Sequence, residues 1–165
     1  MGFQDPRSEG SNNPGATNVL RIAGKTAAAL TLIGDSLKGF IPVLIGQWLG
    51  MDNSVLALVA FAAFGGHCYP VFFGFQGGKG VATAIAATVA FNGLVGLFLI
   101  GTWLLLAKVF RISSLAAIIS FALLPVAVWW FERQWESTAI FAAISIILIW
   151  RHRSNIHRLL QGIEQ

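Results

Sequence analysis

The 165-residue chain is 56% hydrophobic, has a mean hydropathy of +0.72 and carries charged side chains at only 11% of its positions. Soluble domains carry roughly 25% charged residues, so this composition excludes an ordinary soluble fold. It predicts one all-α domain over residues 1–165, a polytopic helical bundle whose partner is the lipid bilayer. A net charge of +4 on so little soluble surface also excludes a nucleic-acid-binding protein. The single Cys68 excludes an internal disulfide and a cysteine-rich metal site.

The first 25 residues are polar and contain no apolar core of a signal peptide. Between Ser11 and Asn18 the sequence SNNPGATN is dense in amide and hydroxyl donors and in residues that favour turns. The apolar residues around Arg21, in VLRI, indicate a short helix at the membrane interface. A disordered terminus is the alternative for this segment.

The first apolar segment, Thr26–Leu49, has about the 20 residues that are needed to cross a bilayer. It contains Asp35 and Lys38, which share one helix face because they are three positions apart. Charges within a span usually face the bundle interior or an aqueous cavity. The pair therefore has two interpretations: an ion pair that only fixes helix packing, or side chains beside a polar site.

A second apolar segment starts at Val55 and runs into the glycine-rich stretch Gly65–Thr83, GGHCYPVFFGFQGGKGVAT. Glycine backbones approach ligands closely, and amide groups before a helix, with one lysine beside them, form a phosphate site. The stretch is not a Walker loop, because Gly80 follows Lys79. A glycine-rich bend between two membrane helices is the alternative. A lone histidine such as His67 is more typical of a hydrogen-bonded structural residue than of a catalyst.

Residues 81–110 form an apolar segment that is too long for one ordinary span of ~20 residues. The Asn92-Gly93 pair in its middle is a turn signal. We therefore predict a hairpin of two short helices at this point. The helices expected from here to the tail are Val81–Phe91, Leu94–Phe110, Leu115–Phe131 and Thr138–Trp150, followed by the basic amphipathic tail 151–165.

These segments make about six transmembrane helices with both termini on one side of the membrane. The turns on the opposite side contain only one basic residue, Arg133, so the positive-inside rule supports the hairpin and predicts an active site on the cytoplasmic face. The first loop, the glycine-rich loop, the loop 111–114 and the tail would meet there. The basic residues on that face would be Arg7, Arg21, Lys25, Lys79, Lys108, Arg111, Arg151, Arg153 and Arg158.

Four polar stretches on one face predict a site for anions, and for phosphate above all. Amide and hydroxyl donors would shape the pocket, and Lys79 and Arg21 would supply charge. The sequence lacks a His-x-Glu metal pattern and the Ser-His-Asp or Cys-His spacing of nucleophilic enzymes. We expect neither a metal nor a cofactor, and the pattern suggests a lipid-making transferase or an anion transporter.

Three motifs resemble those of the bacterial acyl-phosphate:glycerol-3-phosphate acyltransferases, the PlsY family. SNNPGATN at 11–18 is similar to the family's S-G-N-x-G-A-T-N. GHCYPVF at 66–72 and FQGGKGVAT at 75–83 resemble its G-H-x-x-P-V-F and F-K-G-G-K-G-V-A-T. RHRSNIHRL at 151–159 resembles its R-H-x-x-N-I-x-R-L. Asp35, Lys38, Gly39, Ser114 and Leu115 also fall where that family has them.

The resemblance implies a multi-pass enzyme of the bacterial inner membrane that uses acyl phosphate, not acyl-CoA, to acylate the first hydroxyl of glycerol 3-phosphate. The products would be lysophosphatidic acid and phosphate, in the first step of phospholipid biosynthesis. It implies no cofactor and identifies no protein partner. When the family's functional positions are transferred to the matching residues of this sequence, the catalytic positions would be Ser11, Lys79, His152 and Asn155. The substrate- and phosphate-binding positions would be Asn13, Gly15, Thr17, Asn18, Arg21, His67, Gly77, Gly78, Gly80 and Ser114.

The chain departs from the family pattern at three points. The family's first transmembrane helix, expected before the first loop, is missing, which suggests an N-terminally truncated member. Asn12 replaces a motif glycine, and Gln76 replaces a motif lysine and so removes one positive charge near the phosphate. These departures leave open a non-catalytic homologue that acts as a membrane interaction protein. An anion transporter is a third hypothesis, which the lack of an inverted repeat disfavours.

Overall fold

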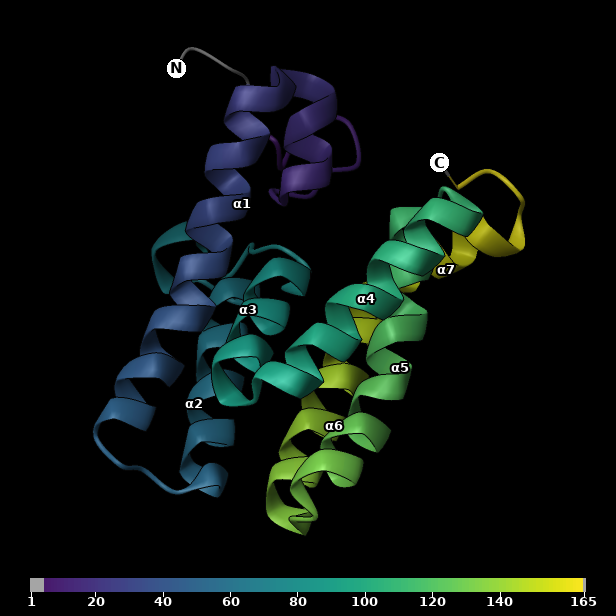
Figure 1. The fold of residues 1–165 in the computed structure, drawn as a ribbon. Helices are drawn as coiled ribbons and strands as arrows, with labels where there is room; N and C mark the ends of the chain where they lie inside the picture. The colour runs from purple at the N-terminus through teal and green to yellow at the C-terminus, as the bar shows by residue number, and fades with distance from the viewer. Residues whose placement is uncertain (1–4, 165) are drawn as a thin grey trace.

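The computed structural model describes residues 5–164, and these residues contain helices and no strand, which confirms the all-α prediction. The helices lie side by side in two groups, with α1, α2 and α3 in one and α4, α5 and α6 in the other (Figure 1). Packing of α2 against α6 joins the groups. The elements are α1 (Ala16–Trp48), α2 (Asn53–Cys68), the 3₁₀ helix η1 (Val71–Phe73), α3 (Val81–Phe91), α4 (Gly93–Phe110), α5 (Ser113–Glu132), α6 (Trp135–Arg151) and α7 (Arg153–Leu160).

Four of the described helical segments are long and apolar enough to cross a membrane: α1, α2 with its continuation to Phe73, α4 and α5. Helix α3 is apolar but shorter. The molecule is thus a membrane helical bundle, as its hydropathy predicts. The span count of six stays a prediction.

Helix α1 contains one break in its backbone, at Gly24, which has φ 82° and ψ −178°. The break divides α1 into a short arm, 16–23, and the long apolar helix that follows it. This is the division that the sequence predicts, with an interfacial helix before the first span. The arm begins three residues earlier than the predicted VLRI start, because Gly15 is the last extended residue of the first loop.

The predicted hairpin between α3 and α4 is confirmed. Asn92 ends α3 and begins α4, and its side-chain oxygen accepts hydrogen bonds from the backbone amides of Leu94 (2.8 Å) and Val95 (3.1 Å). Such an N-cap satisfies amide groups that the first turn of a helix leaves without partners. The turn therefore follows from local chemistry that the Asn-Gly pair already indicated.

The core is built from small residues at the closest helix contacts and from aromatic residues where more space is available. Helix α1 approaches α3 at Gly39, where any Cβ would fall on the carbonyl oxygen of Thr83. The Thr83 hydroxyl donates to the Asp35 carbonyl (2.8 Å) and links the same two helices. Phe91 and Phe141 pack at 4.8 Å between ring centroids, and so connect the two helix groups.

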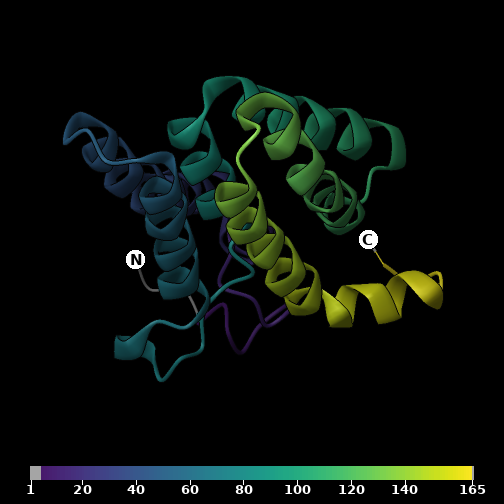
Figure 2. The ribbon, with the colours of Figure 1, turned by 90° about the horizontal axis from the view of Figure 1, so that it is seen from below.

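The tail reverses direction after α7. Helix α7 leads away from the end of α6, and the following residues turn back toward α5 (Figure 2). This reversal brings the last described residue, Glu164, next to Ser114 at the start of α5. The tail therefore closes over the same end of the bundle at which α2 and α6 end.

Candidate active site

The glycine-rich loop between η1 and α3 is held in place by Arg151 at the end of α6. The guanidinium group of Arg151 donates to the carbonyl oxygens of Gly77 (2.7 Å) and Gly78 (2.8 Å). The same group lies 5.2 Å from the ring centroid of Tyr69 at the end of α2. With its carbonyls bound on one side, the loop is fixed between two helix ends.

Three glycines in this loop are required by the geometry. A Cβ on Gly77 would fall on the backbone carbonyl oxygen of His67. A Cβ on Gly78 would collide with the imidazole ring of His67. Gly80 is the N-cap of α3 with φ 81°, a left-handed conformation in which a Cβ would also meet Phe64. The loop is therefore packed against His67 and Phe64, and its shape depends on glycine at all three positions.

His67 links this loop to the charged pair of α1. Its Nδ1 lies 3.4 Å from Asp35 Oδ1, and the Asp35 carboxylate also accepts from Lys38 Nζ (2.8 Å). The ion pair of Asp35 and Lys38 is therefore present and lies beside the loop, and a role for it at that loop stays a prediction. The three side chains line a pocket of about 300 Å³ together with Arg7 and Gly78.

Asn18 organises the first loop. Its side chain is buried, donates to the carbonyls of Pro6 (3.0 Å) and Glu9 (2.9 Å), and accepts from the Ser11 amide (2.9 Å). All of these bonds go to backbone, so this side chain shapes the loop rather than extending into the pocket. Other predicted residues are more accessible: Thr17 and Arg21 are exposed on the arm of α1, and Ser11, Asn13 and Gly15 are half-buried.

A second group of predicted residues converges on one carboxylate in the tail. Glu164 accepts hydrogen bonds from Ser114 Oγ (2.7 Å), Asn155 Nδ2 and Arg158 Nε. Its side chain is only 5% exposed. Three donors from α5 and α7 therefore surround a single buried anion.

Lys79 belongs to this positively charged region. Burial, which has the largest effect, and the charges of Arg158, Arg151 and Arg21 together lower the pKa of Lys79 to about 8, while the charge of Glu164 opposes this shift. The pKa of the Glu164 carboxyl is raised by burial, yet the hydrogen bonds from Asn155, Ser114 and Arg158 and the charge of Arg158 hold it below its usual value. The region is therefore rich in cations and already binds one anion.

His152 lies buried between α6 and α7, and its Nδ1 is 2.8 Å from the Leu148 carbonyl oxygen. Burial lowers the pKa of His152 to about 4, against a smaller opposing effect of that hydrogen bond. The imidazole is therefore neutral near pH 7, donates through Nδ1 and presents Nε2 as an acceptor.

Asn155 presents a buried side-chain oxygen that is able to accept a hydrogen bond. Its amide nitrogen donates to Glu164, which fixes the orientation of the amide. Its Oδ1 is buried and has no hydrogen-bond partner among residues 5–164. A buried acceptor without a donor is costly, so it fits a hydroxyl group supplied by a bound molecule.

The structure brings together Lys79, Ser114, His152 and Asn155, with the glycine loop beside them. Within residues 5–164, the hydrogen bonds of Ser11 and Asn18 stay inside the first loop, and the roles of Ser11, Asn13 and Thr17 remain predictions. The roles assigned from the sequence did not include Arg151, Arg158 or Glu164. Glu164 had one usable signal, since it is the only acidic residue in a basic tail.

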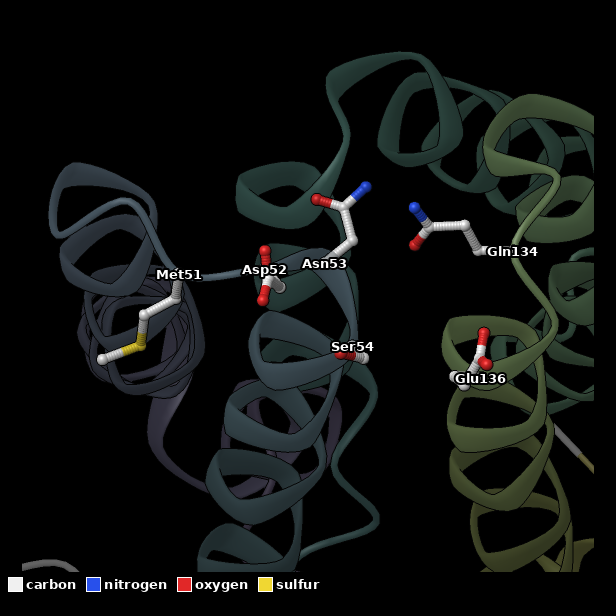
Figure 3. A pocket seen from close by; sticks show the side chains of 6 residues that line it. All are labelled: Met51, Asp52, Asn53, Ser54, Gln134 and Glu136. Carbon is white, nitrogen blue, oxygen red and sulfur yellow. The ribbon is translucent and has the colours of Figure 1, made fainter.

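A larger pocket of about 550 Å³ lies at the opposite ends of α2 and α6. Figure 3 shows Asp52 and Asn53 on one wall and Gln134 and Glu136 on the other. Here Glu132 accepts from the side-chain amides of Asn53 (2.6 Å) and Asn92. None of the predicted site residues lines this pocket, so its size does not make it the candidate site.

Comparison with known proteins finds similarity along nearly the whole of this chain. Residues 1–162 match the family profile "Glycerol-3-phosphate acyltransferase". A protein of that name from Methylococcus capsulatus is 50% identical over 99% of this chain and 83% of its own length. One from Ruthia magnifica is 51% identical over 97% of this chain and 81% of its own. The crystal structure of PlsY (YgiH), an integral membrane glycerol 3-phosphate acyltransferase in its glycerol 3-phosphate form, superposes with a TM-score of 0.93. The two sequences are 42% identical, and the superposition covers 98% of this chain and 82% of the chain in the crystal structure.

Proposed function

Because this chain belongs to the glycerol-3-phosphate acyltransferase family, we propose that it transfers an acyl chain from acyl phosphate to the first hydroxyl of glycerol 3-phosphate. The products are lysophosphatidic acid and inorganic phosphate. The observation that carries this proposal is the group of donors from α5 and α7 around one buried anion, beside Lys79 and the glycine loop.

The Glu164 carboxylate indicates what the site can bind. Ser114, Asn155 and Arg158 already hold this anion with three hydrogen bonds, and charge-assisted bonds of this kind suit phosphate oxygens equally well. Lys79 adds a positive charge whose pKa of about 8 leaves it mostly protonated at pH 7. Two phosphate-bearing substrates would share these cations and the amide groups of the glycine loop.

The reaction needs positioning more than a strong base. Acyl phosphate is a mixed anhydride, so its carbonyl is already activated and phosphate is a good leaving group. The glycerol hydroxyl oxygen forms the new C–O bond as the C–OP bond breaks, and the departing phosphate takes the hydroxyl proton. Asn155 Oδ1, which has no partner in the described residues, would accept a hydrogen bond from the substrate and orient it.

Neutral His152 would help to orient the substrate without adding charge. Its Nδ1–H is committed to the Leu148 carbonyl, so its Nε2 remains an acceptor. Arg151 binds the carbonyl oxygens of the glycine loop and would leave the amide groups of that loop to the phosphate. Arg151 is in this sense a positioning residue, and Lys79 is the residue that would touch phosphate.

The proposal extends to the location of the site. The chain is a membrane protein, and the basic residues of the loop before α3, the α4–α5 junction and the tail gather at one end of the bundle. The positive-inside rule supports placing that end on the cytoplasmic side of a bacterial inner membrane. Acyl phosphate and glycerol 3-phosphate would reach the site from the leaflet and from the cytoplasm respectively.

The test uses the full chain reconstituted in phospholipid vesicles with acyl phosphate and labelled glycerol 3-phosphate. We expect labelled lysophosphatidic acid and an equal amount of released phosphate, and no product when acyl-CoA is the only donor. Product from acyl-CoA alone would contradict the assigned donor. Binding of glycerol 3-phosphate without turnover would favour the non-catalytic homologue, and its passage into the vesicle would favour a transporter.

A further inference from the structure

The turn that carries η1 exposes an unusual amount of apolar surface. Val71 is 69% exposed, Phe72 96%, Phe73 60% and Phe75 59%. These four side chains, here called the aromatic tip, come from five consecutive residues, 71–75, that carry no charge. Figure 2 shows the teal turn of η1 at the edge of the molecule, beyond the end of α2 and away from α4, α5 and α6.

The backbone of this turn is closed on itself. The amides of Phe73 and Phe75 both donate to the Pro70 carbonyl, at 3.2 and 3.0 Å. The amides of Gly74 and Gln76 donate to the Val71 and Phe73 carbonyls, at 3.3 and 3.2 Å. Four successive amide groups are therefore satisfied within the turn, which lowers the cost of moving this backbone into an apolar phase.

The backbone conformation of the turn directs the aromatic side chains outward, and it is strained. Gly74 and Phe75 have φ of 60° and 61°, and a bulky residue such as phenylalanine rarely adopts this left-handed region. The reversal lets Phe72, Phe73 and Phe75 remain exposed rather than pack on the bundle. A folded protein keeps such strain where an interaction compensates for it.

Cations surround the base of the tip. Arg7 lies 5.2 Å from the ring centroid of Phe73, and Arg151 lies 5.2 Å from that of Tyr69. Exposed aromatic side chains next to cations are typical of segments at the level of lipid headgroups. The tip is also continuous with α2, since the apolar segment runs without a break from Asn53 to Phe73.

We propose that the aromatic tip inserts into the membrane interface at the level of the lipid headgroups and forms the lipid-side entrance to the glycine loop. The occupant is the phospholipid leaflet itself. Phe73 lines the 300 Å³ pocket beside Gly77 and Gly78, so an amphiphile that lies along the tip with its acyl chain in the leaflet has its headgroup next to the loop. This second part rests on the proposed function, because it takes acyl phosphate as the amphiphile.

Membrane insertion can be measured without turnover. Phe72→Cys is labelled with an environment-sensitive fluorophore in vesicles, and the buried Cys68 is not expected to react. Glu9→Cys, at an exposed polar position of the first loop, is the matched control. We expect blue-shifted emission at position 72 and strong quenching by lipids with a nitroxide near the glycerol backbone. The control should show emission as in water.

The entrance function is tested with the serine variant. Phe72 touches little else, so Phe72→Ser should fold normally and raise the KM for vesicle-borne acyl phosphate roughly fivefold or more, with the KM for glycerol 3-phosphate unchanged. Phe72→Leu should retain most of the activity. If the fluorophore at position 72 emits in vesicles as it does in water, the proposed insertion is wrong. The same conclusion holds if the emission shifts only when another protein is added. If the probe shows insertion but Phe72→Ser leaves the KM for acyl phosphate unchanged, the tip is not the entrance for that substrate.

Discussion

At the scale of single residues, the charge of Lys79 decides whether the glycine loop binds phosphate. Lys79→Gln removes the charge and keeps a polar side chain of similar length. We expect kcat/KM for glycerol 3-phosphate to fall at least ~10-fold, a loss of about 1.4 kcal/mol or more of transition-state stabilisation. Steady-state kinetics in vesicles provide the measurement.

The control is Lys108→Gln, because Lys108 is exposed near the end of α4 and lies outside the site. Its kcat/KM for glycerol 3-phosphate should stay within about twofold of the wild-type value, because substitutions of exposed residues usually have small effects. Wild-type kinetics in Lys79→Gln would mean that Lys79 only extends from a helix end to the membrane surface, and the phosphate role of the loop would have to be abandoned.

The lowered pKa of Lys79 predicts an alkaline limit to activity. The protonated amine is the phosphate-binding form, so kcat/KM should decline as pH rises through about 8, where the free enzyme loses this charge. One pH unit above that value the loss should approach roughly tenfold. Lys79→Arg should shift the decline well beyond pH 9, because guanidinium stays charged. A wild-type profile that is flat to pH 10 would contradict the assignment.

Asn12 explains how the chain tolerates the loss of a motif glycine. It has φ 54°, a left-handed conformation that asparagine adopts more readily than other residues with a Cβ. We expect Asn12→Gly to leave thermal stability nearly unchanged and Asn12→Ala to cost roughly 1 kcal/mol. Thermal unfolding in detergent tests both variants, with Glu9→Ala as a neighbouring exposed control. An Asn12→Ala protein as stable as wild type would show that the backbone there is not constrained.

At the scale of elements, the break in α1 sets the position of the arm that carries Thr17 and Arg21. Gly24 has φ 82° and ψ −178°, a region that essentially only glycine occupies, and a Cβ there would meet no neighbouring atom. Gly24→Ala therefore tests backbone conformation alone. We expect a loss of roughly 1–3 kcal/mol in stability, together with a several-fold rise in the KM for glycerol 3-phosphate as the arm moves.

Gly34 in the same helix is the matched control. Its backbone is helical and a Cβ there would also meet nothing within 4 Å. Gly34→Ala should therefore keep or slightly raise stability, since alanine is the better helix former by roughly 1 kcal/mol. If both variants behaved alike in thermal unfolding and in KM, the break at Gly24 would have no role in placing the arm.

At the scale of the whole molecule, Glu132 connects helices at the end opposite the site. Its carboxylate accepts from Asn53 at the start of α2 and from Asn92 at the α3–α4 hairpin. Glu132→Ala leaves two half-buried amides without an acceptor, so we expect a loss of roughly 2 kcal/mol in stability. The kinetic constants should not change, because α2 and α6 separate this group from the glycine loop.

Glu136→Ala is the control for this end of the bundle, since Glu136 is exposed and lines the 550 Å³ pocket together with Asn53. Its thermal stability should match wild type within about 0.5 kcal/mol. If Glu132→Ala unfolded at the wild-type temperature, the Glu132 hydrogen bonds would not stabilise the fold. If it changed the KM for either substrate, the two ends of the molecule would not be independent.

The sequence by itself determined most of the elements of this protein. Apolar length predicted the helices because a bilayer requires ~20 residues per span, and Asn92-Gly93 predicted the hairpin because asparagine caps its own next turn. The arm before the first span was also visible in the chain, as VLRI after a polar loop. These features depend on interactions within a few residues, which a linear pattern records directly. The motifs likewise indicated the family, although they left the role of each residue open.

Only the tertiary structure decided which side chains meet. Arg151 binds Gly77 and Gly78 from more than 70 positions away, and Glu164 binds Ser114 from 50 positions away. His67 packs behind Gly78 because α2 and the loop fold onto each other. A sequence pattern shows which face of one helix is polar, but it does not show which partner that face meets. That choice follows from the packing of all the helices together, and so the anion-binding group in the tail becomes apparent only in the folded chain.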